Sequence, residues 1–200
     1  HVAIKLLSND LLKNKTERQQ FENEAKIIAM LHHPNIVKIL NAKCTADCCY
    51  YAMELINGKS LNQYKINNIR QIAEIALKLA KALAYAHSCN VLHRDIKPSN
   101  ILIDDMGELH VSDFGLASFG NNSSYVDNKS GTLRYMAPEK VLRGDNTVLT
   151  DQYSFGVTLY ELVKQQPFIN CADINKAAKN ISCGNVPRLN TKENDFDAII

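Results

Sequence analysis

Apolar positions recur with a helical period over several stretches of the chain. In residues 16–31 and 69–87 they return every three to four positions, which predicts two amphipathic helices. Residues 150–163 are apolar nearly all round, as expected of a helix that is buried on every side. Residues 173–183 again show one apolar face, and they predict a further helix near the end of the chain.

Shorter apolar runs predict the strands. Residues 2–7, 37–45 and 49–56 have this character, and they lie around the first predicted helix. Residues 101–103 and 109–111 flank a polar segment that contains a glycine, which predicts a β-hairpin. A small sheet-plus-helix lobe would then precede a larger, mainly helical lobe, which is an α+β architecture.

Charged and polar residues cluster on both sides of the predicted hairpin. Residues 93–100 have the sequence His-Arg-Asp-Ile-Lys-Pro-Ser-Asn, and residues 113–115 have the sequence Asp-Phe-Gly. The hairpin would hold Asn100 and Asp113 side by side, and their side-chain oxygens are ligands of the kind that Mg²⁺ prefers. Either motif alone could be a solvated polar loop, but the two at this separation favour a site for phosphoryl transfer.

Two more side chains of this loop have the chemistry that phosphoryl transfer needs. Asp95 is placed to orient an acceptor hydroxyl and to take its proton, and Lys97 can carry positive charge to a γ-phosphate. The two motifs resemble those of eukaryotic-type protein kinase catalytic domains, with Ile96 where the family signature has leucine. The resemblance covers the whole chain, and it implies a bilobal protein-kinase-like fold with ATP and Mg²⁺ as cofactors.

Other segments resemble the same family in the same order. Lys5 ends a Val-Ala-Ile-Lys strand, and the resemblance implies that its side chain contacts the α- and β-phosphates of ATP. Glu24 matches the helix glutamate that pairs with this lysine, although Glu22 is the alternative. Residues 131–139 close with the family's Ala-Pro-Glu signature, and Asp151 matches an aspartate that anchors the backbone of the catalytic loop.

The resemblance also implies where adenine binds. Met53 stands at the gatekeeper position, and the backbone carbonyl of Glu54 and the backbone N–H of Ile56 would face the adenine edge. Ala3 and Leu102 would lie on the two faces of the ring. Apolar side chains on both faces and two backbone hydrogen bonds make a physically reasonable purine pocket.

The substrate class follows from two details of the resemblance. Lys97 two residues after Asp95, and Thr132 after a glycine, are typical of kinases that act on serine and threonine hydroxyls of protein substrates. The segment 116–136 is rich in Ser, Asn and Gly, and a phosphate there would pair with Arg94. An activating kinase or self-phosphorylation in trans could supply it. The candidate acceptors are Ser123, Ser124, Tyr125 and Ser130.

Composition limits the alternatives. The 200 residues are 46% hydrophobic, which argues against a disordered chain, and the formal net charge of +2 does not imply a nucleic-acid partner. No apolar run is long enough to span a bilayer, so we expect no membrane contact from this segment. Six cysteines without a C-x-x-C pair suit a reducing cytoplasm. Cys44, Cys48 and Cys49 could hold zinc, but a strand turn accounts for them better.

The chain departs from the family pattern at both ends. No Gly-rich loop precedes Lys5, so the resemblance implies a partial domain. Residues 1–55 would form an N-lobe without its first two strands, and residues 56–200 a truncated C-lobe, so we expect weak activity from this chain alone. A catalytically silent, pseudokinase-like scaffold and a small-molecule phosphotransferase are the other function classes. The complete set of candidate catalytic residues argues against a scaffold. The activation segment argues against a small-molecule phosphotransferase.

Overall fold

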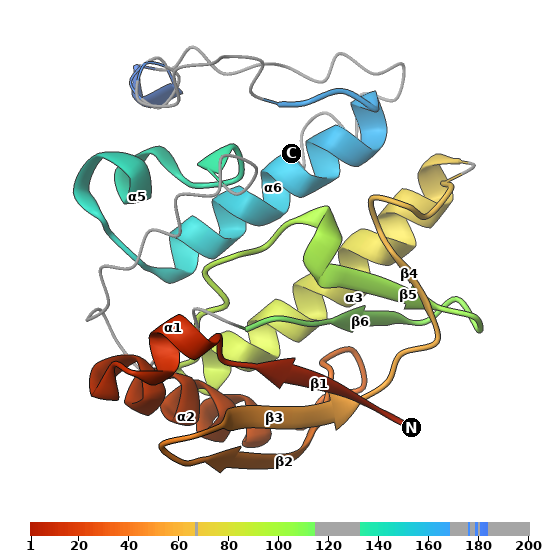
Figure 1. Cartoon of the computed structure of the whole chain (residues 1–200). Helices are drawn as coiled ribbons and strands as arrows, with labels where there is room; N and C mark the ends of the chain where they lie inside the picture. The colour runs from red at the N-terminus through yellow and green to blue at the C-terminus, as the bar shows by residue number, and fades with distance from the viewer. Residues whose placement is uncertain (67, 115–132, 169–175, 177–178, 180, 184–200) are drawn as a thin grey trace.

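Two small antiparallel sheets and the helices packed against them form the molecule (Figure 1). This computed structural model describes residues 1–66, 68–114, 133–168, 176, 179 and 181–183. The α+β, protein-kinase-like architecture expected from the sequence is confirmed.

The first sheet has the strand order β1-β3-β2. It consists of β1 (Val2–Leu6), β2 (Ile39–Cys44) and β3 (Cys49–Glu54), and both neighbouring pairs are antiparallel. The short helix α1 (Asn9–Leu12) and the longer helix α2 (Lys15–Ala29) follow β1 in the chain. Alternate residues of β1 are exposed and half-buried, so the strand presents one face to the interior and one to solvent.

Helix α2 is amphipathic and begins at an asparagine cap. The side chain of Asn14 accepts a hydrogen bond from the backbone N–H of Thr16, which satisfies one of the free donors at the start of the helix. Phe21, Ala25 and Ile28 lie on one buried face, as the period of the sequence predicts. This face fixes how α2 lies against the sheet.

The second sheet has the order β4-β5-β6 and lies beside the first along the molecule (Figure 1). It consists of β4 (Gly58–Ser60), β5 (Ile101–Asp104) and β6 (Leu109–Val111). The hairpin predicted from the apolar runs is the antiparallel pair β5–β6. β4 packs so closely on β5 that a Cβ atom on Gly58 would lie 2.1 Å from the carbonyl oxygen of Ile103, so a larger side chain does not fit.

The remaining helices carry the second lobe. They are α3 (Ile69–Ser88), α5 (Pro138–Arg143) and α6 (Val148–Lys164). Asn68 caps α3 by accepting the N–H of Gln71, and Thr147 with Thr150 forms a capping box at α6. The helix expected over residues 173–183 lies almost wholly outside the described residues.

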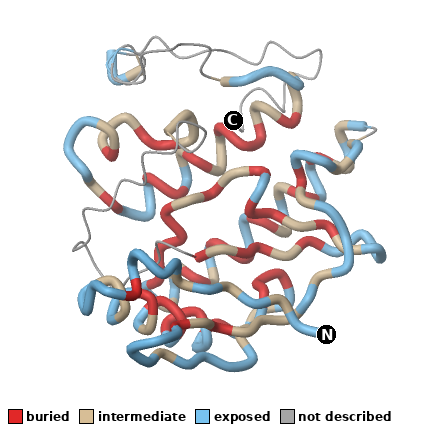
Figure 2. The backbone as a smooth tube through the Cα atoms, viewed as in Figure 1, coloured by how far each residue is buried: buried red, intermediate tan, exposed pale blue. Residues whose placement is uncertain are grey.

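One hydrophobic core joins the two lobes. Figure 2 shows buried backbone concentrated in the middle of the molecule, with exposed segments at the first sheet and the outer loops. The core combines side chains from α2, α3, β5, β6 and α6. Its most buried members include Leu79, Ile96, Ile101, Leu109 and Leu159. The first sheet and α2 share a second, smaller cluster of Leu12, Phe21, Ala25, Cys49 and Tyr51.

The cysteines differ from the expectation of reduced thiols. Cys44 and Cys49 are directly opposite in the β2–β3 register and form a disulfide at the end of the hairpin. Spacing along the chain did not indicate this pair, because the strand register brings the two residues together. Zinc bound by Cys44, Cys48 and Cys49 is set aside, since two of those ligands are bonded to each other.

Candidate active site

A buried carboxylate holds the backbone of the loop formed by residues 93–100. Asp151, in the first turn of α6, accepts the backbone N–H of His93 and that of Arg94, each at 2.8 Å. The side chain of His87 donates to the same carboxylate at 2.9 Å. Burial would raise the pKa of Asp151, but these donors prevail and hold its pKa below the usual value. The anchoring contact expected of Asp151 is present.

A buried lysine holds the same peptide from the other side. The Lys140 ammonium of α5 donates to the Arg94 carbonyl oxygen at 2.6 Å. Arg94 has a φ of 69°, a left-handed conformation that costs free energy for any residue with a side chain. Burial lowers the pKa of Lys140, and the nearby carboxylates Asp151 and Asp95 oppose that change. The strained turn is therefore fixed by buried groups on α5 and α6.

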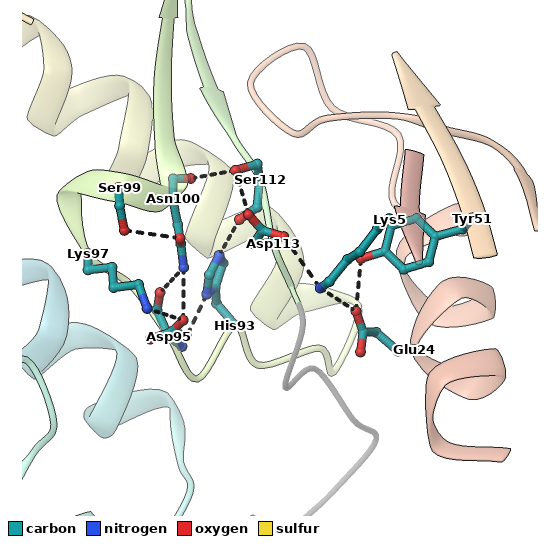
Figure 3. Close-up of polar contacts among 10 residues, drawn as sticks. All are labelled: Lys5, Glu24, Tyr51, His93, Asp95, Lys97, Ser99, Asn100, Ser112 and Asp113. Carbon is teal, nitrogen blue, oxygen red and sulfur yellow. Dashed lines mark hydrogen bonds and ion pairs between the residues drawn. The ribbon is translucent and has the colours of Figure 1, made fainter. Parts of the chain in front are cut away.

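Asp95 projects from this turn into a small polar cluster (Figure 3). Its Oδ2 atom lies 2.7 Å from the Lys97 ammonium and accepts a hydrogen bond from Asn100 Nδ2 at 3.0 Å. Asn100 Nδ2 also donates to the Asp95 carbonyl oxygen at 2.8 Å. The other carboxylate oxygen, Oδ1, is buried and has no hydrogen-bond partner among the described residues. One oxygen of Asp95 is thus held, and the other can accept a proton or a hydrogen bond from a hydroxyl.

His93 is a wholly buried part of the same loop. Its Nδ1 atom accepts the backbone N–H of Asp95 at 3.2 Å, so Nε2 carries the proton and donates to the Ser112 carbonyl at 3.0 Å. The imidazole lies 4.4 Å, centroid to centroid, from the ring of Phe114. Burial lowers the pKa of His93, which keeps the ring neutral as this hydrogen-bond pattern requires.

Asn100 and Asp113 are brought together by the β5–β6 hairpin. Ser112 donates its backbone N–H at 2.9 Å and its hydroxyl at 3.2 Å to the Asn100 carbonyl, and the hydroxyl lies 3.5 Å from Asp113 Oδ2. Asn100 Nδ2 is committed to Asp95, and the amide oxygen accepts the Ser99 hydroxyl at 3.3 Å, so a second lone pair of this oxygen is the one that could bind a metal. Asp113 adds a carboxylate that is half-exposed. An amide oxygen beside a carboxylate fits Mg²⁺, which prefers few, hard oxygen ligands.

Lys5 reaches this cluster from the first sheet. Its ammonium lies 3.2 Å from Glu24 Oε1 on α2 and 3.4 Å from Asp113 Oδ1 (Figure 3). Burial would lower the pKa of Lys5, but Glu24, Tyr51 and Asp113 together raise it overall. The rival partner, Glu22, instead pairs with Lys26 along the helix surface. The ion pair therefore joins Lys5 to Glu24. Asp113 also contacts Lys5, so it connects the two lobes.

The five residues expected around adenine lie in or beside the strands that flank this junction. Ala3 and Met53 are cross-strand partners and both are half-buried. Glu54 pairs with Val2, and its backbone N–H donates to the Lys38 carbonyl at 3.0 Å. Ile56 follows the sheet, and Leu102 lies in β5, each of them half-buried. Their contact with a nucleotide stays a prediction.

Some expected site residues lie outside the described part of the chain. Thr132 and the four candidate phosphorylation sites all fall within residues 115–132. Within the described ranges, no cluster of three or more His, Cys, Asp or Glu side chains is arranged to hold a metal. No helix in these same ranges is both long and apolar enough to cross a membrane.

Three buried polar residues were not predicted from the sequence. Tyr51 contacts the Lys5–Glu24 pair, Lys140 holds the Arg94 carbonyl, and His93 supports the backbone of Asp95. The position of His93 within its motif could have indicated a role. The partners of Tyr51 and Lys140 lie 27 and 46 residues away, and no local pattern marks such contacts.

The fold and this cluster together define a protein-kinase-like class of protein. The chain matches the protein kinase domain family over residues 1–198, and it belongs to that family.

Three curated relatives show the same similarity. Serine/threonine-protein kinase PknD of Protochlamydia amoebophila is 32% identical over 216 residues, which cover 90% of this chain and 22% of PknD. A probable serine/threonine-protein kinase of Clostridium perfringens is 34% identical over 200 residues, covering 96% of this chain and 29% of the relative. PrkC of Bacillus subtilis, also a serine/threonine-protein kinase, is 34% identical over 187 residues, covering 90% of this chain and 29% of PrkC. The chain thus spans less than a third of each of these three relatives.

Proposed function

We propose that this protein transfers the γ-phosphoryl group of ATP to serine or threonine hydroxyls of protein substrates. The observation that carries the proposal is the asymmetric Asp95 carboxylate. One oxygen is fixed by Lys97 and Asn100, and the other has no partner among the described residues. This is the arrangement that an acceptor hydroxyl needs, because a positioned base must both orient the hydroxyl and take its proton.

The neighbouring residues divide the rest of the work. Lys97, next to Asp95, would neutralise charge that develops on the transferred group. Lys5, held by Glu24, would bind the α- and β-phosphates. Asn100 and Asp113 would hold Mg²⁺, which when bound supplies positive charge to the phosphates. These roles use two groups of contacts. Lys5 lies near Glu24 and Asp113, Asp95 contacts Lys97 and Asn100, and Ser112 connects Asn100 with Asp113.

The remaining assignments rest on the family. Met53, Glu54 and Ile56 would line the adenine site, with Ala3 and Leu102 on its two faces. Thr132 would link to Asp95 and Lys97, and the relatives named as serine/threonine-protein kinases support that substrate class. A phosphate on the activation segment, added by another kinase or in trans by a second copy, would pair with Arg94.

Replacing Asp95 by asparagine tests the proposal most directly. Asp95→Asn keeps the shape and the contact with Asn100 but removes the basic oxygen, so kcat on a protein substrate should fall by about 10²–10⁴-fold. Nucleotide affinity should change by less than about twofold, because Asp95 acts on the acceptor. The matched control is Asp105→Asn, which replaces an exposed carboxylate in the β5–β6 turn and should leave kcat unchanged.

The magnesium dependence of nucleotide binding separates this proposal from a silent scaffold. Isothermal titration of the wild-type protein with ATP, with and without Mg²⁺, should show tighter binding with the metal. Equal affinity in both conditions, together with no phosphorylation of protein substrates, would favour the scaffold. Wild-type turnover by Asp95→Asn would show that another group is the base.

A further inference from the structure

Tyr51 is placed to act on the lysine–glutamate pair. It lies at the centre of β3, directly opposite Lys5 in the β1–β3 register, and it is 1% exposed. Its hydroxyl donates to Glu24 Oε1 at 3.0 Å, the same oxygen that lies 3.2 Å from the Lys5 ammonium. Figure 3 shows the three side chains meeting at this one carboxylate oxygen. Tyr51 therefore touches the pair through its hydroxyl.

The ring of Tyr51 makes a second set of contacts. It packs on Phe21 of α2 with ring centroids 5.2 Å apart. The Lys5 ammonium lies 5.5 Å from the centroid of the Tyr51 ring. Tyr51 is also the largest side chain of the small cluster that joins α2 to the first sheet. One residue thus connects the helix that carries Glu24 with the strand that carries Lys5.

Glu24 needs this second donor. Its side chain is nearly buried, and a buried carboxylate is unfavourable unless hydrogen bonds replace the lost water. Lys5 can satisfy it in part, but the same ammonium lies 3.4 Å from Asp113. Among the described residues, the tyrosine hydroxyl donates to no carboxylate other than Glu24, so it can hold Glu24 while Lys5 contacts Asp113.

We infer that Tyr51 is a positioning residue that holds Glu24 in place through its hydroxyl, so that Lys5 stays directed at the nucleotide phosphates. The inference rests on the proposed function for the ligand, and on the contacts above for the geometry. A phenylalanine at this position would keep the packing against Phe21 but would lose the hold on the carboxylate. The hydroxyl therefore affects nucleotide binding more than it affects folding.

The test is Tyr51→Phe, with Tyr50→Phe as the matched control. Tyr50 is the next residue of β3, so its side chain points to the other face of the sheet. Isothermal titration with ATP and Mg²⁺ should show about threefold to tenfold weaker binding for Tyr51→Phe and no change for Tyr50→Phe. Equal affinities in wild type and Tyr51→Phe would overturn the inference.

A double-mutant cycle shows whether the hydroxyl acts through Glu24. In a Glu24→Ala background the carboxylate is gone, so Tyr51→Phe should no longer weaken binding. If Tyr51→Phe weakened binding equally in both backgrounds, the hydroxyl would act on something other than Glu24, and the inference would fail. Weakening by Tyr51→Phe that depends on Glu24 would support it.

A measurement without nucleotide keeps this inference separate from the proposed function. NMR titration of the Glu24 carboxyl should show a higher pKa in Tyr51→Phe than in wild type, because the hydroxyl stabilises the carboxylate form. A wild-type protein that binds no nucleotide would overturn the proposed function, and the positioning role along with it. The Glu24 titration would then still show whether the hydroxyl holds the carboxylate, and an unchanged pKa would refute even that contact.

Discussion

The loop of residues 93–100 and the site formed by Lys5, Glu24 and Tyr51, called here the lysine site, are held in different ways. The turn at His93–Arg94 is fixed through its backbone, by Asp151 below and Lys140 beside it. The lysine site is fixed through side chains alone, from Lys5, Glu24 and Tyr51. Hydrogen bonds from buried groups to the backbone restrict the main chain of a loop to one conformation. Side-chain ends, in contrast, can exchange one partner for another.

The surroundings of the two regions differ as well. The loop lies against the large core that unites α3, β5, β6 and α6, and its residues are mostly buried. The lysine strand has three exposed apolar residues on its other face, namely Val2, Ile4 and Leu6. We therefore expect the loop to be essential for folding and the lysine site to be adjustable with little effect on the fold.

The largest expected effect is the loss of the loop anchor. Asp151→Ala leaves two buried backbone N–H groups and His87 without their acceptor, so the free energy of unfolding should fall by about 3–5 kcal/mol. Glu24→Ala in the lysine site should lower it by about 1–2 kcal/mol, because Lys5 still reaches Asp113. Urea denaturation of both variants measures the difference. Equal losses would show that the two regions are held equally.

A smaller effect should follow from removing the lysine that holds Arg94. Lys140→Met fills the same space but leaves the Arg94 carbonyl without its donor, so the free energy of unfolding should fall by about 1–3 kcal/mol. Lys26→Met is the control, since its exposed pair with Glu22 is worth about 0.5 kcal/mol. Denaturation curves compare the two lysines.

Kinetics can sharpen the same contrast between loop and lysine site. Because Lys140 acts on the turn that carries Asp95, Lys140→Met should lower kcat and leave nucleotide affinity nearly unchanged. Lys5→Met should instead weaken nucleotide affinity, since Lys5 would bind the phosphates. A Lys140→Met variant with normal kcat and reduced affinity would contradict this assignment.

The sequence predicted the fold well wherever a period extended over several turns. Helices α2, α3 and α6 and the β5–β6 hairpin are confirmed, because their apolar faces are the ones that the core buries. β4 was not predicted, since Gly-Lys-Ser has no apolar alternation and is a strand only because β5 offers hydrogen bonds. The disulfide was missed for a similar reason, namely that register decides it.

The site was predicted only as far as local motifs extend. The hairpin places Asn100 beside Asp113 as its turn geometry implies, and both belong to short motifs. Tyr51 and Lys140 were missed because each resembles an ordinary strand or helix residue until its distant partner is known. Contacts made across the core depend on packing, which a pattern along one chain does not contain.

The smallest expected effect is a pH dependence that belongs to the loop. Burial lowers the pKa of His93, so the folded protein keeps it neutral while the unfolded chain takes up a proton near its usual pKa of about 6.5. The contribution of neutral His93 to the free energy of unfolding is therefore complete above this pH and is lost as the pH falls below it. The free energy of unfolding should decrease with a slope approaching about 1.4 kcal/mol per pH unit.

His93→Gln tests whether His93 causes this slope. Glutamine can still donate to the Ser112 carbonyl but does not titrate, so the variant should be less stable at pH 7.5 and should lose less on going to pH 5.5. Glu24 has the opposite sign: burial raises its pKa, so taking up a proton favours the folded state. Denaturation at several pH values gives both slopes. An unchanged slope in His93→Gln would mean that acid destabilises the protein elsewhere, and the loop would lose its distinction from the lysine site in this respect.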